Sequence, residues 1–397
     1  MPEERIYLDN CVTTRPAPEV LSAMQPFLTE EFWYPASFVS TGERISAVLD
    51  EFRTTFARTI NAQASEIHFT AGGTLANNIA IKGLISAVYT RGKHIICSVV
   101  DYPDLLTNAA YFENMGFEVT YLTADSEAFV SADELKKAIR PDTLLFMTTA
   151  VNHVVGTIQP LSDYARVLAE ADHKIYYHVD AGQAYGKMKL DMQELGIDTM
   201  AVSGHKIHAP QGVGFLFAKK GTKLSQVIHG VRRIDNFQTG GISVALIAGF
   251  AKAAEMLFAD LEGQINHLYD LSGYLLEKLE ANLDHIELNG PRGTARACHN
   301  INVSIDYIEG EAIAMMLDLE GITVATGSAC ASQGLQPNYI LMAIGKNHVQ
   351  SHGSIKLTLS RYTARAQIDR VVEKLTAITR ELRQRSPLYQ AVIAKER

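Results

Sequence analysis

The sequence predicts an α/β protein, with a large domain built on a mainly parallel sheet and a smaller α+β domain. Between residues 65 and 220, short runs rich in β-branched and aromatic residues alternate with stretches of helical spacing. This alternation is typical of a parallel sheet covered by helices on both faces. Residues 243–285 carry apolar positions three and four apart, which predicts long helices. After LNGPRG at 288–293, short strand and helix patterns return.

The individual elements follow from these patterns. Strands of the large domain are predicted at EIHFT (66–70), KHIICSVV (93–100), FEVTYLT (117–123), TLLFMTTAV (143–151), KIYYHVDA (174–181) and GVGFLFAK (212–219). Helices are predicted at 74–90 and 131–139. Later, INVSID (301–306) and SIKLTLS (354–360) predict strands, and GEAIAMMLDLEG (310–321) and IDRVVEKLTAITREL (368–382) predict helices. We therefore expect a large domain at 15–255 and a small one formed by 1–14 and 256–397.

Composition and charge restrict the class of protein. Of the 397 residues, 47% are hydrophobic and 20% charged, a globular profile. The net charge of −8 argues against non-specific binding to nucleic acid or anionic membranes. The N-terminal MPEERIYLDN lacks an apolar signal region, and the four cysteines form no CxxC pair, which suits a reducing compartment. We expect a soluble cytoplasmic protein.

Two strand ends predict a cofactor. Lys206 in SGHKIHAPQGVGFLF follows a short strand and precedes a Pro/Gly-rich turn, so its amine should emerge at a strand end. The strand in KIYYHVDAGQAYG ends on Asp180. A buried carboxylate is costly unless a cationic group faces it. Pyridoxal phosphate offers a protonated pyridine nitrogen for this purpose, and its aldehyde needs a lysine for a Schiff base.

A phosphate site is predicted at a helix N-terminus. EIHFTAGGTLANNIAIKG supplies a strand, the turn 71–74 with Gly73 and Thr74, and then a helix. Ser203 and His205 flank Lys206 and could donate to the phosphate. Each feature alone has an ordinary interpretation: a simple turn, an N-cap, or a metal pair in HKIH without an evident third ligand. Together and in this order they predict a pyridoxal-phosphate site; no nucleoside-triphosphate loop GxxxxGK[ST] occurs.

With these motifs in place, the chain resembles the fold-type I pyridoxal-phosphate enzymes. More narrowly, it is similar to the class-V aminotransferase-like cysteine desulfurases of the nitrogen-fixation and iron–sulfur-assembly type. The resemblance spans nearly the whole chain, through YLDNCVTTRPAPEV, HFTAGGTLANNIAIKG, VNHVVGTIQP, YYHVDAGQAYGK, SGHKIHAPQGVG, NINVS, TGSACASQGLQPNYIL and LSRYTARAQID.

The resemblance implies a role for each matching residue. Lys206 would form the Schiff base and Asp180 would face the pyridine nitrogen, while Gln183 would lie near the phenolic oxygen. Thr74, Ser203 and His205 would hold the phosphate. Cys330 would be the nucleophile that takes sulfur from L-cysteine, leaves L-alanine, and carries a persulfide to a sulfur acceptor. Such acceptors would serve iron–sulfur clusters, thio-cofactors or tRNA, and the enzyme would be a homodimer.

Three residues depart from the family pattern near the substrate. Tyr102 replaces a histidine that stacks on the cofactor and moves protons; tyrosine can stack, but its ordinary pKa near 10 makes it a poorer base. His153 replaces an asparagine near the phenolic oxygen and the substrate carboxylate. Lys356 replaces the arginine that grips that carboxylate, and an ammonium cannot reproduce the bidentate guanidinium fork. The resemblance also implies a substrate-binding role for Asn10, since the family's N-terminal LDNCVTT segment runs close to the active site.

Further departures lie nearby. Gly241 stands where the family has a threonine that reaches the partner subunit's cofactor, and Arg232 and Arg233 are gained just before it. Those arginines are either a solvated turn or a remodelled contact across a dimer. Cys11 is a cysteine where the family usually has none, and it is either a second active-site thiol or a buried small hydrophobe.

Three functions remain open at this point. The first is a cysteine desulfurase with Cys330 as the sulfur carrier; an incidental exposed Cys330 is the plain alternative. The second is a pyridoxal-phosphate lyase or aminotransferase-like enzyme on another amino acid, motivated by Tyr102, His153 and Lys356. The third is a non-enzymatic paralogue that scaffolds a sulfur-transfer complex, against which the retained Lys206 speaks.

Overall fold

A seven-stranded sheet forms the centre of the larger part of the molecule. The computed structural model describes residues 5–230, 237, 241–327 and 337–396. Within these, the strand order is β2-β8-β7-β6-β5-β3-β4, and β8 runs antiparallel to both of its neighbours. The remaining pairs are parallel. The strands are β2 (Ile67–Thr70), β3 (His94–Ser98), β4 (Glu118–Leu122), β5 (Thr143–Thr149), β6 (Tyr176–Asp180), β7 (Thr199–Ser203) and β8 (Gly214–Ala218).

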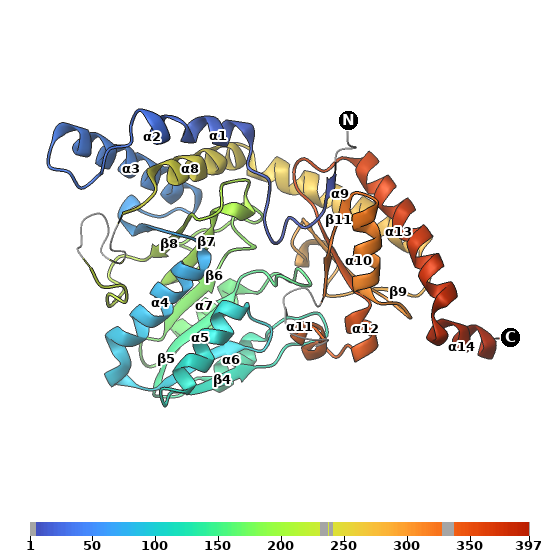
Figure 1. Cartoon of the computed structure of the whole chain (residues 1–397). Coiled ribbons are helices and arrows are strands. Elements are labelled where there is room, and N and C mark those ends of the chain that lie inside the picture. The colour runs from blue at the N-terminus through green and yellow to red at the C-terminus, as the bar shows by residue number, and fades with distance from the viewer. Residues whose placement is uncertain (1–4, 231–236, 238–240, 328–336, 397) are drawn as a thin grey trace.

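Helices cover both faces of this sheet because successive strand residues point to opposite sides. Phe146, Val179 and Met200 face one core, with α1 (Pro18–Met24), α3 (Ser40–Thr59), α7 (Leu161–Ala169) and α8 (Val244–Phe258). Met147 and Tyr176 face the other side, where α4 (Gly73–Val88) and α5 (Pro103–Glu113) pack. Figure 1 shows α1, α2 (Pro26–Thr29), α3 and α8 grouped together, away from α4 and α5. The helix α6 (Ala132–Ala138) contacts α7.

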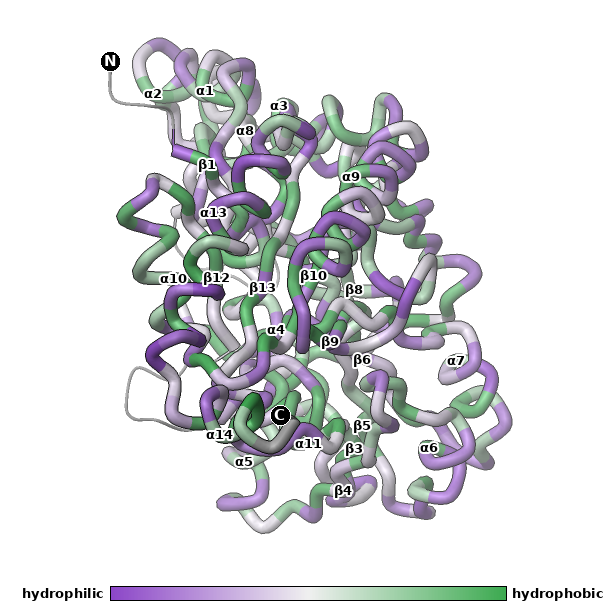
Figure 2. The backbone as a smooth tube through the Cα atoms, turned by 90° about the vertical axis from the view of Figure 1, so that its right-hand side faces the viewer, coloured by the Kyte–Doolittle hydropathy of each residue, from purple (hydrophilic) through white to green (hydrophobic). Residues whose placement is uncertain are grey.

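A second core forms around an antiparallel sheet in the C-terminal part. Its order is β12-β13-β10-β9, from β9 (Ile286–Leu288), β10 (Asn300–Ile305), β12 (Ala325–Thr326) and β13 (Ser354–Thr358). One sheet face packs on α9 (Leu261–Asn282) and α13 (Arg365–Arg385), whose leucines and isoleucines recur three and four apart. Figure 2 shows green hydrophobic and purple hydrophilic stretches alternating along the chain. β1 (Ile6–Tyr7) pairs with β11 (Ile322–Thr323), so the N-terminal segment joins this part.

The opposite face of the small sheet is polar and buried. In its register, Asn302 pairs with Lys356 and Asn300 with Thr358, and all four side chains are at most 7% exposed. The remaining helices are α10 (Gly310–Leu319), α11 (Tyr339–Ala343), α12 (His348–His352) and α14 (Pro387–Glu396). Ile340 and Leu341 of α11 pack into the core of the large sheet. A buried polar sheet face is costly unless its groups find partners, so it marks the place where the two parts meet.

The α/β class with a mainly parallel large sheet is confirmed, while several element bounds differ from the sequence predictions. The long helical region divides into α8 and α9, because the Asp260 side chain accepts from the backbone N–H of Gly263 and starts a new helix. The expected domain boundary after residue 255 falls inside α8. No helix within the described residues combines the length and apolarity needed to cross a bilayer.

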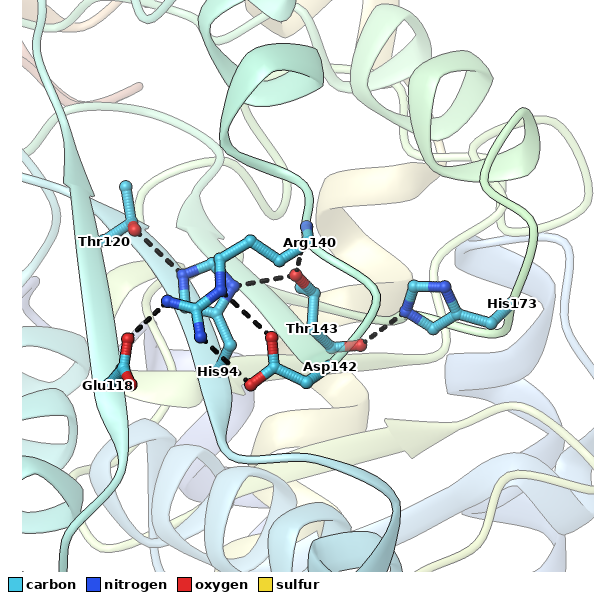
Figure 3. Close-up of polar contacts among 7 residues, drawn as sticks. All are labelled: His94, Glu118, Thr120, Arg140, Asp142, Thr143 and His173. Carbon is cyan, nitrogen blue, oxygen red and sulfur yellow. Dashed lines mark hydrogen bonds and ion pairs between the residues drawn. The ribbon is translucent and has the colours of Figure 1, made fainter.

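The amino-terminal edge of the large sheet holds a polar cluster around His94 (Figure 3). The backbone N–H of Arg140 donates to Thr143 Oγ1 at 2.8 Å, so the Thr143 hydroxyl proton is available for His94 Nδ1 at 2.7 Å. His94 Nε2 lies 2.8 Å from Thr120 Oγ1, so both ring nitrogens have a hydroxyl partner. Burial and the nearby Arg140 guanidinium lower the pKa of His94. The imidazole is therefore neutral, and its hydrogen bonds link β3, β4 and β5 near their amino-terminal ends.

Because the pKa of His94 is lower in the folded than in the unfolded chain, its contribution is complete above the unfolded value near 6.5 and is lost as pH falls below it. His94→Gln should therefore reduce the free energy of unfolding by about 1–3 kcal/mol at pH 8. It should also weaken the decrease in thermal unfolding midpoint between pH 7 and 5. The matched control is His267→Gln, on an exposed position of α9. An unchanged pH profile in His94→Gln would contradict this assignment.

Candidate active site

A cavity of about 660 Å³ opens at the carboxyl ends of β6 and β7. This is the edge of a parallel sheet at which ligands generally bind in α/β proteins. Seven residues that the sequence singled out line it: Gly73, Thr74, Tyr102, Asp180, Ser203, His205 and Lys206. Residues missed by sequence reasoning, including Val12, Thr13 and Asp104, complete the wall.

The amino-terminal end of α4 forms one side of this cavity. Gly72 has a φ of +142°, which favours glycine, and the Gly73 N–H donates to Ser203 Oγ at 3.1 Å. A Cβ on Gly73 would collide with that hydroxyl, so glycine is required for the close approach of α4 to β7. First-turn backbone N–H groups and the positive end of the helix dipole favour an anion here. Thr74 lies in this first turn and lines the cavity.

Asp180 provides a buried carboxylate at the end of β6. It is 7% exposed and accepts from Asn77 Nδ2 at 2.7 Å and from the Gly182 N–H at 2.8 Å. Burial raises the pKa of Asp180, while the nearby Lys206 and these two donors oppose that rise. Its carboxylate is thus prepared to face a cationic ring nitrogen.

The residues that orient Asp180 were not visible in the sequence pattern. Asn77 lies one turn into α4, and its Oδ1 is 3.0 Å from His178 Nε2. His178 Nδ1 in turn lies 2.9 Å from Thr199 Oγ1. Burial lowers the pKa of His178 to about 3, so the ring stays neutral and donates one proton to Asn77 Oδ1. This relay fixes the Asn77 amide with its Nδ2 toward Asp180.

Lys206 and Tyr102 face each other across the cavity. Lys206 follows β7 in the turn Gly204–Lys206 and is 8% exposed, with Nζ 5.1 Å from the centre of the Tyr102 ring. The backbone N–H of Tyr102 donates to Thr149 Oγ1 at 2.8 Å. This bond places Tyr102 at the carboxyl end of β5, where a planar cofactor could stack on its ring.

The three departures from the family pattern lie in contact. The His153 and Tyr102 rings meet edge to face, with centres 4.8 Å apart, and Lys356 Nζ donates to the His153 carbonyl oxygen at 3.3 Å. Burial, then Lys356 and Lys206, holds the pKa of His153 well below its usual range. His153 is accordingly a neutral imidazole beside two ammonium groups.

The remaining predicted residues lie in different places. Gln183 bonds with Cys11, which is 3% exposed. The Asn10 side chain donates to the Tyr7 and Thr358 carbonyl oxygens and lines a separate cavity of about 360 Å³. A Cβ atom placed on Gly241 would lie 4.0 Å from Cε2 of the Tyr34 ring. The predictions on Cys330, Arg232 and Arg233 fall outside the described residues.

The described residues on either side of the Cys330 segment are bonded to each other and to the active site. Asn338 Nδ2 donates to the Gly327 carbonyl oxygen at 2.5 Å. The hydroxyl of the next residue, Tyr339, donates to the Asp101 carbonyl oxygen at 2.6 Å, directly before Tyr102. These bonds join the C-terminal part of the chain to the wall of the cavity.

The residues present fit pyridoxal phosphate. An anion site at the start of α4, a buried carboxylate at Asp180 and a primary amine at Lys206 surround one cavity. These are the partners that its phosphate, pyridine nitrogen and aldehyde require. Ser203, His205 and Thr74 would hold the phosphate, and Tyr102 would cover the ring.

Asn77→Leu should weaken pyridoxal-phosphate binding about tenfold, because it removes a hydrogen bond to a charged, buried carboxylate. Quenching of intrinsic fluorescence by added cofactor measures the dissociation constant. Asn108→Leu is the control: Asn108 is similarly buried, but it bonds to the Asp104 carbonyl oxygen. Equal affinities for both variants would show that Asn77 does not support the cofactor site.

Comparison with known proteins places these features in a family. The family model for aminotransferase class-V matches residues 6–371. The chain is 41% identical to "Cysteine desulfurase IscS" of Dictyoglomus turgidum over 98% of each chain. It is 39% identical to "Cysteine desulfurase IscS" of Methanosarcina thermophila, over 96% of this chain and 94% of that one.

Solved structures agree. A "NifS-like protein" superimposes with a TM-score of 0.89 at 28% identity, covering 95% of this chain and 100% of the other. "SspA in complex with cysteine" gives a TM-score of 0.79 at 28% identity, covering 90% of this chain and 100% of the other. Sequence identity over the full length and a shared fold lead to one conclusion: the chain belongs to the class-V aminotransferase family and, within it, to the cysteine desulfurases.

Proposed function

We propose that this chain is a pyridoxal-phosphate-dependent cysteine desulfurase that converts L-cysteine to L-alanine and takes the sulfur onto Cys330. The observation that carries the proposal is the meeting of Lys206, Asp180 and the start of α4 around one cavity, in a chain whose relatives are cysteine desulfurases. The departures from the family pattern at Tyr102, His153 and Lys356 leave all three of these elements in place. A pure scaffold would need none of them.

Each side chain has a task that its position supports. When bound, pyridoxal phosphate supplies an electron sink that stabilises negative charge at the α-carbon of an amino acid. Asp180 would keep the pyridine nitrogen protonated, and Lys206 would hold the aldehyde and move a proton at the α-carbon. Ser203, His205 and Thr74 would bind the phosphate. Tyr102, opposite Lys206, would stack on the ring and exclude water from that side.

The substrate side is less usual and rests on Lys356 and His153. The Lys356 ammonium is buried, donates to the His153 carbonyl oxygen, and would bind the substrate carboxylate as a point charge. His153, neutral at physiological pH, can form a hydrogen bond with the phenolic oxygen of the cofactor. These residues also favour the second candidate, an enzyme of the same cofactor that acts on another amino acid.

Sulfur transfer requires a thiolate. In the proposed step, the Cys330 thiolate attacks the sulfur of the substrate, the bond from that sulfur to the β-carbon breaks, and the carbon takes a proton to give alanine. The sulfur remains on Cys330 as a persulfide. We infer that a sulfur-acceptor or scaffold protein of iron–sulfur, thio-cofactor or tRNA pathways then takes it. The contacts of Asn338 and Tyr339 support delivery next to Tyr102.

The cofactor-loaded chain, incubated with L-cysteine, should release alanine and gain one sulfur on the Cys330 peptide, as seen by mass spectrometry. Cys330→Ala should retain the visible absorbance of the bound cofactor and lose more than about 99% of turnover, since the nucleophile is removed. Cys97→Ala, in the core under α5, is the control. Continued sulfur release from Cys330→Ala would rule out its role. If cysteine is inert and another amino acid changes the cofactor spectrum, the second candidate stands.

A homodimer is part of the same proposal. An aromatic cluster, Phe32, Trp33, Tyr34 and Phe38, lies exposed between α2 and α3, with Phe38 94% exposed. Large exposed apolar clusters commonly mark interfaces, and two-fold dimers are the commonest oligomers. Gly241, where the family contacts the second subunit, lies near Tyr34.

Sedimentation equilibrium should therefore give twice the mass of one chain. Phe38→Asp should raise the dimer dissociation constant at least about tenfold, because a charge would be buried in an apolar contact. Leu319→Asp is the matched control, since Leu319 is also strongly exposed but lies on α10. A monomeric wild type, or equal behaviour of the two variants, would contradict this interface.

Two further features belong to this proposal. The division into domains at 15–255 and at 1–14 with 256–397 stays a prediction that the two separate cores support. A cytoplasmic location is supported by the cysteines: Cys11, Cys97 and Cys298 are buried and free of disulfides.

A further inference from the structure

Cys11 lies at a junction of four separate segments beside the cofactor cavity. Its Sγ is 3.2 Å from Gln183 Oε1, 3.6 Å from the His153 carbonyl oxygen, and 3.8 Å from both His299 Nε2 and Asn300 Nδ2. Its backbone N–H donates to Thr358 Oγ1 at 2.9 Å. The thiol thus touches two residues expected at the phenolic oxygen of the cofactor, and its surroundings are polar rather than those of a small hydrophobe.

The geometry of Gln183 is set by Cys11 at both ends of the amide. Gln183 Nε2 donates to the Cys11 carbonyl oxygen at 2.8 Å. A carbonyl only accepts, so the amide nitrogen must face it, and Oε1 then faces the thiol. The Cys11 S–H donates its one proton to that Oε1. Gln183 Nε2 keeps a second N–H, which has no partner among the described residues.

Among the described residues, the donor that reaches Gln183 Oε1 is the Cys11 thiol. Gln183 is 3% exposed, so water does not reach its amide freely. If the thiol is removed, Oε1 loses its donor in a buried environment, and the amide can rotate away from its bonded orientation.

We propose that Cys11 is a positioning residue, whose thiol holds the Gln183 amide so that its remaining N–H is directed at the phenolic oxygen of the bound cofactor. The proposal rests on the proposed function only in requiring pyridoxal phosphate in the cavity. Through the Gln183 N–H, Cys11 stabilises the anionic form of that oxygen without touching the reacting atoms. Its sulfur also lies 3.6 Å from the His153 carbonyl oxygen, and Gln183 is the residue that its one proton holds.

The test compares Cys11→Ala and Cys11→Ser in the full-length, cofactor-loaded protein. Cys11→Ala should weaken cofactor binding about threefold to tenfold, which corresponds to the loss of one hydrogen bond. The pH midpoint of the cofactor's visible absorbance change should move upward by about half a unit or more, because the phenolic oxygen loses a donor. Cys11→Ser replaces the donor and should restore the midpoint to near that of the wild type.

Cys298→Ala is the matched control. Cys298 is equally buried, but its thiol points to the Lys187 carbonyl oxygen and does not contact Gln183. It should lower the thermal unfolding midpoint without moving the spectral midpoint. The proposal is overturned if Cys11→Ala titrates like the wild type, if Cys298→Ala shifts the midpoint equally, or if Cys11→Ser fails to restore it.

The same preparations separate this proposal from the proposed function. Binding and spectral titration need no turnover, so a protein that binds the cofactor and releases no alanine contradicts the desulfurase assignment alone. Mass spectrometry of the Cys11 peptide after incubation with L-cysteine gives a further outcome. Sulfur added to Cys11 would make it a second carrier thiol and overturn the positioning role.

Discussion

The buried carboxylate of Asp180 is the constraint on which the rest of the site depends. A charge at the end of β6 is destabilising without partners, and it receives them from Asn77, from the Gly182 N–H and from Lys206. Asn77 can reach Asp180 only if α4 packs across the large sheet. The same helix then brings Gly73 against Ser203. Asn77 is four residues from Gly73, about 6 Å along the axis, so one helix sets both the anion site and the support of the carboxylate.

The second organising feature is the polar joint between the two cores. β10 and β13 bury isoleucine, leucine and valine on one face and asparagine, lysine and threonine on the other. The N-terminal segment passes through this joint, where Asn10 and Cys11 bond to Thr358. Gln183 joins it from the large sheet side. Groups that bind a substrate or cofactor must be polar and also shielded from bulk water. The polar joint between the two cores provides both conditions.

The unusual residues near the substrate behave as one unit. Tyr102 contacts the His153 ring, and the His153 carbonyl oxygen accepts from Lys356. Lys356 and Lys206 both disfavour protonation of His153, so the imidazole stays neutral beside them. These contacts join the three residues into one group that adjoins the cavity through Tyr102.

The sequence by itself determined the α/β class, the strand ends that carry Asp180 and Lys206, and the Gly-Gly-Thr start of α4. These features are local: a strand, the residue that ends it and the turn that follows are neighbours in the chain.

The antiparallel direction of β8 and the division between α8 and α9 needed the structure, because they depend on strand pairing and on a cap at Asp260.

Only the tertiary structure decided what supports these groups. Asn77 meets Asp180 across 103 residues, and Gln183 meets Cys11 across 172. Asn10 turned out to line a second cavity rather than the one around Lys206. No periodicity or motif records which distant polar groups become partners, because burial forces that pairing only once the helices and the two cores have packed.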